Sequence, residues 1–134
     1  MTDTYHVIVW IDHRLAHIYN VTRDDISELA TIRAPDEGRG HIHHNAGSVG
    51  PGHVAVPPAF LKAVAEALAT AREILIVGPA DARTTLKKYI DLQMPLVGKR
   101  IRGVEPMERA NSEEIHAFAT LYFRQRDLMS PSGQ

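Results

Sequence analysis

Three of the eight histidines of this chain, His41, His43 and His44, lie within four residues. Imidazole is a common neutral metal ligand, and it can also stack on nucleic-acid bases. In an extended segment, side chains two residues apart point the same way. His41 and His43 could therefore form a three-histidine zinc site with His53 or His13, or a divalent-metal module that also uses His44. RNA contact by these histidines and simple solvation in a surface loop are the other two interpretations that the sequence leaves open.

Three carboxylates suggest a different chemistry, because each lies at or just after the carboxyl end of a predicted strand. These residues are Asp12, Asp81 and Glu105. Cleavage of a phosphodiester by two metal ions needs carboxylates that gather around a metal pair about 4 Å apart. Asp12 also suits a hairpin turn, however, and Asp81 suits a helix cap. A metal-dependent nuclease is therefore an alternative function, with the carboxylates as its catalytic residues.

Basic residues concentrate between Arg83 and Arg102, where only Asp91 opposes them. They are Arg83, Lys87, Lys88, Lys99, Arg100 and Arg102. Such a cluster can bind the phosphates of RNA, or it can be a solvated helix face with a strand flank.

Composition excludes several classes of protein. The chain has 134 residues and no cysteine, so disulfides, thiolate metal sites and cysteine nucleophiles are excluded. No apolar run approaches the roughly 18 residues of a membrane span. The first four residues carry no basic region typical of a secretory signal, so the cytoplasm is the expected compartment. A net charge of −1 argues against a polycation that coats nucleic acid.

Hydrophobic periodicity predicts five strands and three helices. The strands are expected at 5–11, 15–21, 26–34, 74–77 and 100–105. The first helix has Pro57 and Pro58 at its start, the second begins near Ala80 or Asp81, and the third follows an N-cap at Asn111. In the third helix, an apolar stripe is expected at Ile115, Phe118, Ala119 and Tyr122.

The element order β-β-β-α-β-α-β-α predicts an α/β fold of ribonuclease-H-like order. We expect a five-stranded mixed sheet with helices on both faces and with the first strand at its centre. One domain should span residues 1–129, with a long Gly/His-rich loop at 35–58 and a flexible tail at 130–134. The carboxyl ends of four strands should meet at one edge of the sheet, where ligands bind in open α/β sheets.

The chain resembles the middle domain of the eukaryotic and archaeal class-1 peptide-chain release factors and their Pelota relatives, in particular the stand-alone bacterial translational machinery proteins. Three motifs carry the resemblance. They are Val9-Trp10-Ile11-Asp12 with Ala16-His17-Ile18, Ile74-Leu75-Ile76-Val77-Gly78-Pro79 with Arg83, Leu86 and Tyr89, and Gly38-Arg39-Gly40.

The resemblance implies a translation-related protein that binds the ribosome or RNA. Release factors carry a Gly-Gly-Gln tip in the loop that corresponds to 35–58, but no glutamine lies between Ala34 and Phe60. We therefore expect no peptidyl-tRNA hydrolysis, no catalytic residues for that reaction and no required cofactor. Contact with RNA or the ribosome is expected from Arg39, His41, His43 and His44 together with the basic cluster. A homodimer is also expected, because small domains often cover an exposed sheet edge by pairing.

Overall fold

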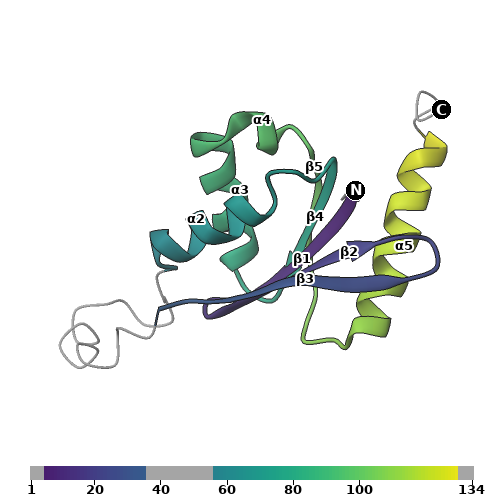
Figure 1. Ribbon diagram of the computed structural model, residues 1–134, viewed down its shortest axis with the longest axis horizontal. Helices are drawn as coiled ribbons and strands as arrows, with labels where there is room; N and C mark the ends of the chain where they lie inside the picture. Colours follow the sequence, from purple (N-terminus) through teal and green to yellow (C-terminus); the bar gives the residue numbers. More distant parts are fainter. Residues whose placement is uncertain (1–4, 36–55, 130–134) are drawn as a thin grey trace.

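The computed structural model describes residues 5–35 and 56–129 (Figure 1). Within them, five strands form one mixed sheet in the order β3-β2-β1-β4-β5. The strands are β1 (His6–Ile11), β2 (Leu15–Val21), β3 (Ile26–Arg33), β4 (Glu73–Gly78) and β5 (Ile101–Pro106). The helices are α2 (Pro58–Ala67), α3 (Ala82–Gln93), α4 (Pro95–Gly98) and α5 (Ser112–Met129). The predicted fold class and element order are confirmed, with α4 as a short addition.

Strand β1 lies at the centre of the sheet, as its continuous apolar run predicts. It pairs antiparallel with β2 and parallel with β4, and β4 pairs parallel with β5. Its side chains alternate between two cores: Val7, Val9 and Ile11 belong to one cluster, and Ile8 and Trp10 belong to the other. This strand therefore supplies apolar side chains to both faces of the sheet.

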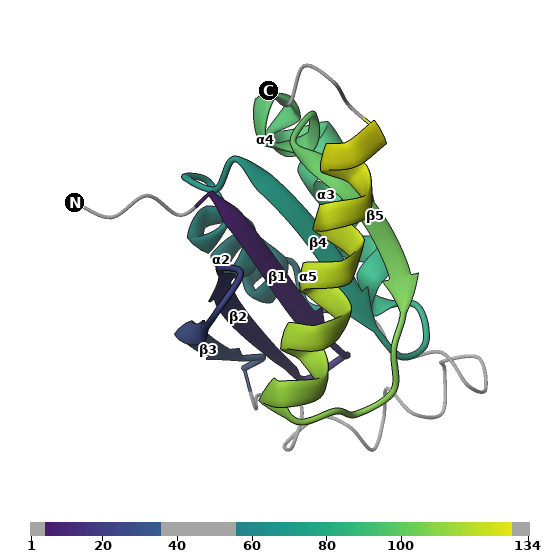
Figure 2. The same cartoon turned by 90° about the vertical axis from the view of Figure 1, so that its right-hand side faces the viewer.

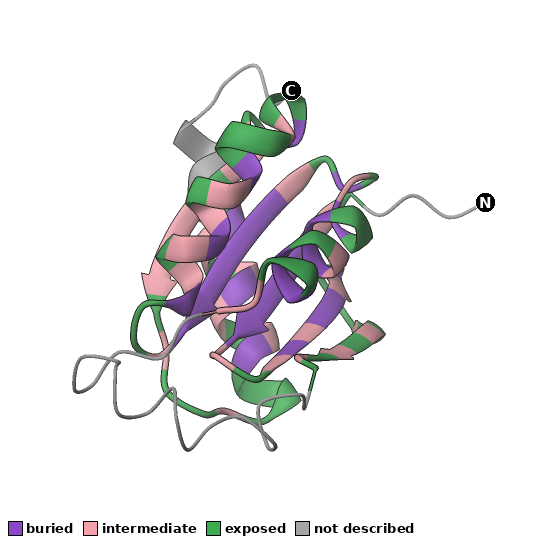
Figure 3. Ribbon diagram, turned by 90° about the vertical axis from the view of Figure 1, so that its left-hand side faces the viewer, coloured by how far each residue is buried: buried purple, intermediate pink, exposed green. Residues whose placement is uncertain are grey.

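The helices form a layer on each face of the sheet. Helices α2 and α3 cover one face, and α5 crosses the other (Figures 1 and 2). Figure 3 shows that buried positions concentrate in the central strands, whereas the outer strand β3 is largely exposed. Within the described residues, no helix combines the length and the apolar character needed to cross a membrane.

Helix α2 begins at Pro58, as the proline pair predicts, because proline suits the first helical position, and the last residue of the predicted 35–58 loop is therefore helical. Two details differ from the sequence-based expectations. Helix α4 is an addition that periodicity does not predict, because a single turn is too short to show a helical period. The buried line of α5 is Ile115, Ala119 and Phe123, which lie four residues apart, so Phe118 and Tyr122 are only half-buried beside it.

Candidate functional site at the carboxyl edge of the sheet

Asp12 shapes the hairpin at the carboxyl end of β1. Its Oδ1 accepts hydrogen bonds from the backbone N–H groups of Arg14 and Leu15, both at 2.8 Å. An aspartate that bonds backbone groups two and three residues ahead stabilises a tight turn. Of the two interpretations of Asp12, the structure therefore supports the hairpin residue.

The neighbouring His13 joins this hairpin to the loop after β4. Its Nε2 lies 2.7 Å from Oδ1 of Asp81, although 68 residues separate the two in sequence. Asp81 is the N-cap residue of α3, but its carboxylate makes no capping hydrogen bond there. Its backbone carbonyl instead accepts hydrogen bonds from the hydroxyls of Thr84 and Thr85. The predicted convergence of these two strand ends is thus present.

A close approach of two strands fixes the turn after β4. Gly78 has φ +155°, and a Cβ at this position would collide with the backbone carbonyl of Ile11. Only glycine allows both this conformation and this approach. Arg83 then holds the turn, because its Nη1 donates to the carbonyl of Gly78 at 3.0 Å and to that of Ala80. At least part of the Arg83 guanidinium is therefore occupied within the fold.

The third carboxylate, Glu105, lies on β5 with a partner of its own. Its Oε2 accepts a hydrogen bond from the hydroxyl of Tyr122 on α5 at 3.4 Å. In the described part of the chain, no group of three or more His, Cys, Asp or Glu side chains could hold a metal ion. The structure therefore brings Asp81 to His13 and Glu105 to Tyr122, but it does not gather Asp12, Asp81 and Glu105 around a common metal.

The basic residues of the second half divide between the two ends of the sheet. Arg83 lies at the carboxyl edge, whereas Arg100 lies beside the amino end of β4, where its backbone carbonyl accepts from the N–H of Ile74. The guanidinium of Arg100 donates to the carbonyls of Ala69 at 2.8 Å and Ala71 at 3.3 Å. Like Arg83, Arg100 supports the backbone, so these two arginines do not form one phosphate-binding patch.

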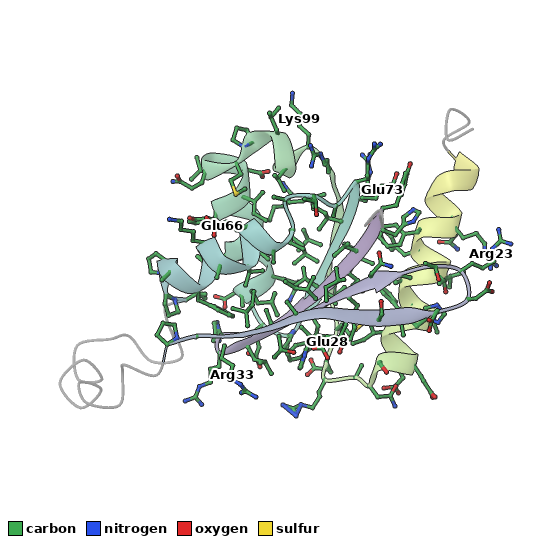
Figure 4. All side chains as sticks on the ribbon, in the orientation of Figure 1. Arg23, Glu28, Arg33, Glu66, Glu73 and Lys99 are labelled. Carbon is green, nitrogen blue, oxygen red and sulfur yellow. The ribbon has the colours of Figure 1, made fainter. Side chains whose placement is uncertain are left out.

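The remaining cations of this cluster are more exposed. Lys87 pairs with Asp91 one turn along α3, at 2.5 Å, and Arg102 lies 3.7 Å from Glu73. Lys88 and Lys99 are exposed, and Figure 4 shows Lys99 pointing outward beyond α4. Exposed lysines can exchange water for a phosphate at small desolvation cost, which makes these two the most accessible cations of the cluster.

The histidine cluster and its neighbours lie outside the described residues. They are Arg39, His41, His43, His44 and His53. The chain leaves the sheet toward them from β3, where the N–H of Ala34 donates to the carbonyl of Arg14 at 2.8 Å. The last residues described before this segment therefore lie beside the β1–β2 hairpin, which also carries Asp12 and His13.

The structure also forms a polar cluster that the sequence does not indicate, on the α5 face of the sheet. Glu28 of β3 accepts hydrogen bonds from His17 and Thr31. These hydrogen bonds, the one from Thr31 first, hold the pKa of Glu28 below its ordinary value. Simple alternation along β3 places residues 28 and 31 on opposite faces, so no sequence signal points to this cluster.

Comparison with solved structures finds the same fold in proteins of translation. The chain matches Archaeoglobus fulgidus Pelota with a TM-score of 0.59 and 15% identity, over 92% of this chain and 32% of that one. Thermoplasma acidophilum Pelota matches with a TM-score of 0.61 and 20% identity, over 90% of this chain and 34% of that one. An archaeal translation termination factor matches with a TM-score of 0.53 and 13% identity, over 96% of this chain and 41% of that one.

These similarities show a shared fold over most of the chain at low sequence identity. The chain spans about a third to two fifths of the length of these proteins. No protein-family model and no curated protein sequence matches it.

Proposed function

We propose that this chain is a translation-related protein that binds the ribosome or RNA in the manner of a release-factor middle domain, without hydrolysing peptidyl-tRNA. The observation that carries the proposal is the fold shared with two Pelota proteins and an archaeal termination factor over nine tenths or more of this chain. Because a fold alone does not define a function, the particular residues must supply the rest.

The segment between β3 and α2 is the proposed contact region. Release factors carry their Gly-Gly-Gln tip in the loop at this place in the fold. Here the segment contains Gly38-Arg39-Gly40 and three closely spaced histidines, but no glutamine. Arginine and histidine side chains can bind phosphates and stack on bases, and glycine lets the backbone approach RNA closely. This composition supports contact with RNA without the hydrolytic tip.

Of the basic cluster, Lys88 and Lys99 are the residues we expect to add phosphate contacts. Both are exposed, whereas Arg83 and Arg100 donate to backbone carbonyls within the fold. Lys87 and Arg102 each have a carboxylate partner, which weakens but does not remove their attraction for phosphate.

Co-sedimentation with ribosomes and with single-stranded RNA, measured over a series of salt concentrations, tests this proposal. We expect binding that weakens with salt. A variant with Arg39, His41, His43 and His44 changed to alanine should bind more weakly, because it lacks the proposed RNA-binding side chains. In Lys88→Gln with Lys99→Gln, the log–log salt slope should decrease by about 0.7 to 0.9 for each phosphate that the protein no longer neutralises.

Lys62→Gln is the matched control, because Lys62 is an exposed lysine of α2 outside the proposed RNA-binding residues. Its binding should equal that of the unchanged protein. A folded protein that binds neither ribosomes nor RNA at low salt would contradict the proposal. Release of peptide from peptidyl-tRNA in a ribosomal assay would contradict the part that concerns hydrolysis.

Metal binding by His41, His43, His44 and His53 is a second, separable proposal. Three or four imidazoles within thirteen residues have the ligand chemistry that zinc prefers. Elemental analysis of protein purified without a histidine tag, after exposure to zinc and removal of free metal, should find about one zinc per chain. The alanine variant of these four residues should retain none, and equal retention by both proteins would contradict the proposal.

A further inference from the structure

A pocket of about 520 Å³ lies on the α5 face of the sheet, opposite α2 and α3. Its lining residues come from strands β1, β2 and β3 on one side and from the residues leading into α5 and the start of α5 on the other. Figure 2 shows α5 crossing this face of the sheet. Small-molecule sites in proteins occupy about 300 to 1,000 Å³ and combine apolar walls with a few polar groups. This pocket has that size and composition, and none of its lining residues belongs to the contact region proposed above.

A β-bulge builds the anionic side of the pocket. Ile18 pairs with Ala30 and Tyr19 with Glu28, so Leu29 has no partner on β2 and is the extra residue of β3. The extra residue places Glu28 and Thr31 on the same face, and the Thr31 hydroxyl donates to Oε2 of Glu28. Glu28 is thereby held as an acceptor at the pocket wall.

His17 completes this side of the pocket. Its Nδ1 lies 2.8 Å from Oε2 of Glu28, and because a carboxylate can only accept, Nδ1 must carry the proton. In the neutral ring Nε2 is then an acceptor. Within the described residues, neither this Nε2 nor Oε1 of Glu28 has a hydrogen-bond partner. Because the lone pair of Nε2 points away from Glu28, Oε1 of Glu28 is the acceptor on this side of the pocket that a donor group can reach.

Two aromatic rings lie near the imidazole of His17. The ring of His17 stacks on Tyr19 with centroids 6.0 Å apart, and it lies 6.4 Å from the ring of Trp10. An ionised carboxylate among aromatic rings is a favourable environment for an ammonium group, which gains both charge pairing and cation–π attraction. The raised pKa of Tyr19, caused first by burial and then by the charge of Glu28, is consistent with a negative potential here.

The far wall has the opposite charge. Arg109 lines the pocket and forms no ion pair or hydrogen bond with any residue that the structure describes. Ser112 lies beside it on the same wall. A guanidinium binds a carboxylate through two parallel hydrogen bonds, which makes it specific for a planar anion. Between the two charged sides, Leu15, Ile26 and Ile115 provide apolar surface.

We propose that this pocket binds a small amino acid, with its ammonium group at Glu28 and its carboxylate at Arg109. The charges of the ligand complement the two sides of the pocket, and its hydrocarbon part contacts the apolar residues between them. The proposal does not depend on ribosome or RNA binding.

Titration of the isotope-labelled full chain, followed by backbone amide NMR shifts, tests the proposal. The probes are L-leucine, 4-aminobutyrate and 6-aminohexanoate, which differ in the spacing of ammonium and carboxylate. Butylamine and butyrate each carry only one of the two charges. We expect at least one zwitterion, at concentrations up to about 10 mM, to shift the amides of residues 26–31 and 109–112. Each one-ended analogue should bind about tenfold or more weakly than that zwitterion.

Two variants locate the contacts. Glu28→Gln and Arg109→Gln should each weaken binding of the zwitterion by about 10- to 100-fold, as expected for loss of a charge-assisted hydrogen bond. Lys62→Gln, on the other face, should bind as the unchanged protein does, and circular dichroism checks that all three variants fold. The proposal is overturned if no zwitterion shifts these amides, if butylamine or butyrate binds equally well, or if either variant retains full affinity.

Discussion

Glu28 and Tyr19 are opposite each other on β3 and β2, and the charge of Glu28 acts on the phenol of Tyr19. The hydrogen bonds from Thr31 and then His17 stabilise the ionised form of Glu28 and lower its pKa. A lowered pKa means that Glu28 contributes stability above its unfolded-state pKa and loses that contribution as the pH falls through its folded-state pKa. The pKa of Tyr19 shifts in the opposite direction, because burial and the negative charge of Glu28 raise it.

The substitution Glu28→Gln should lower the pKa of Tyr19 without returning it to its ordinary value. The charge of Glu28 disappears, but burial, which is the larger cause, remains. NMR titration of the tyrosine ring carbons measures this pKa directly. Because a raised pKa disfavours the phenolate in the folded state, the stability that Tyr19 contributes is lost as the pH rises, and the variant should lose it at lower pH.

An unchanged pKa of Tyr19 in the variant would show that the charge of Glu28 does not reach the phenol.

At the scale of elements, helix α5 begins with a reciprocal pair of hydrogen bonds. Oδ1 of Asn111 accepts from the N–H of Glu114 at 2.8 Å, and Oε1 of Glu114 accepts from the N–H of Asn111 at 2.9 Å. This capping box satisfies backbone donors that the first helical turn leaves unpaired. The sequence predicts this start, because Asn111 followed three residues later by a glutamate is a local signature.

Replacing Asn111 by alanine should destabilise the protein by about 1 kcal/mol, because the N–H of Glu114 loses its acceptor. For a chain of this size, the melting temperature should fall by about 3 to 5 °C, measurable by circular dichroism. Ser112→Ala is the matched control, since the Ser112 hydroxyl has no hydrogen bond within the described residues. Equal melting temperatures of the two variants would show that the cap contributes nothing.

The elements also show which features a single sequence can predict. The central position of β1 was predictable, because its continuous apolar run supplies side chains to two cores. The start of α5 was predictable, because its capping box has a local sequence signature. The bulge at Leu29 could not be predicted from the sequence. One extra residue in β3 inverts the alternation of its side chains between the two faces, and only the pairing with β2 reveals that residue. The roles of Arg83 and Arg100 were also hidden, because the carbonyls that they bind are brought near only by tertiary structure.

The candidate site was predictable in position but not in detail. The topology placed Asp12 and Asp81 at the same edge of the sheet, and the structure has them there. The partner of Asp81 is His13, however, because the hairpin after β1 brings this imidazole to the turn after β4. Sequence spacing contains no information about such a contact across 68 residues.

At the scale of the whole molecule, two exposed leucines stand out near the end of α3 and in α4. Leu92 is 78% exposed and Leu96 is 69% exposed. Large exposed apolar side chains that lie close together commonly mark a contact surface. This surface is our candidate for the expected homodimer interface.

A double variant with Leu92→Asp and Leu96→Asp should therefore self-associate less than the unchanged protein, because charges would have to be buried in the interface. Sedimentation equilibrium over a range of protein concentrations measures the effect. Leu121→Asp, which changes an exposed leucine of α5 on the other face, should leave self-association unchanged. The prediction fails if the unchanged protein is monomeric at every concentration or if the double variant dimerises equally well.

Ala34 and Val56, on either side of the segment from 36 to 55, both pack against the same core cluster. The scaffold therefore secures the two ends of this segment with residues that do not belong to it. Because both flanks are held by the core, we expect changes in the length or composition of the segment to have little effect on folding. The same scaffold could then serve a different biochemical role after the exchange of this one segment.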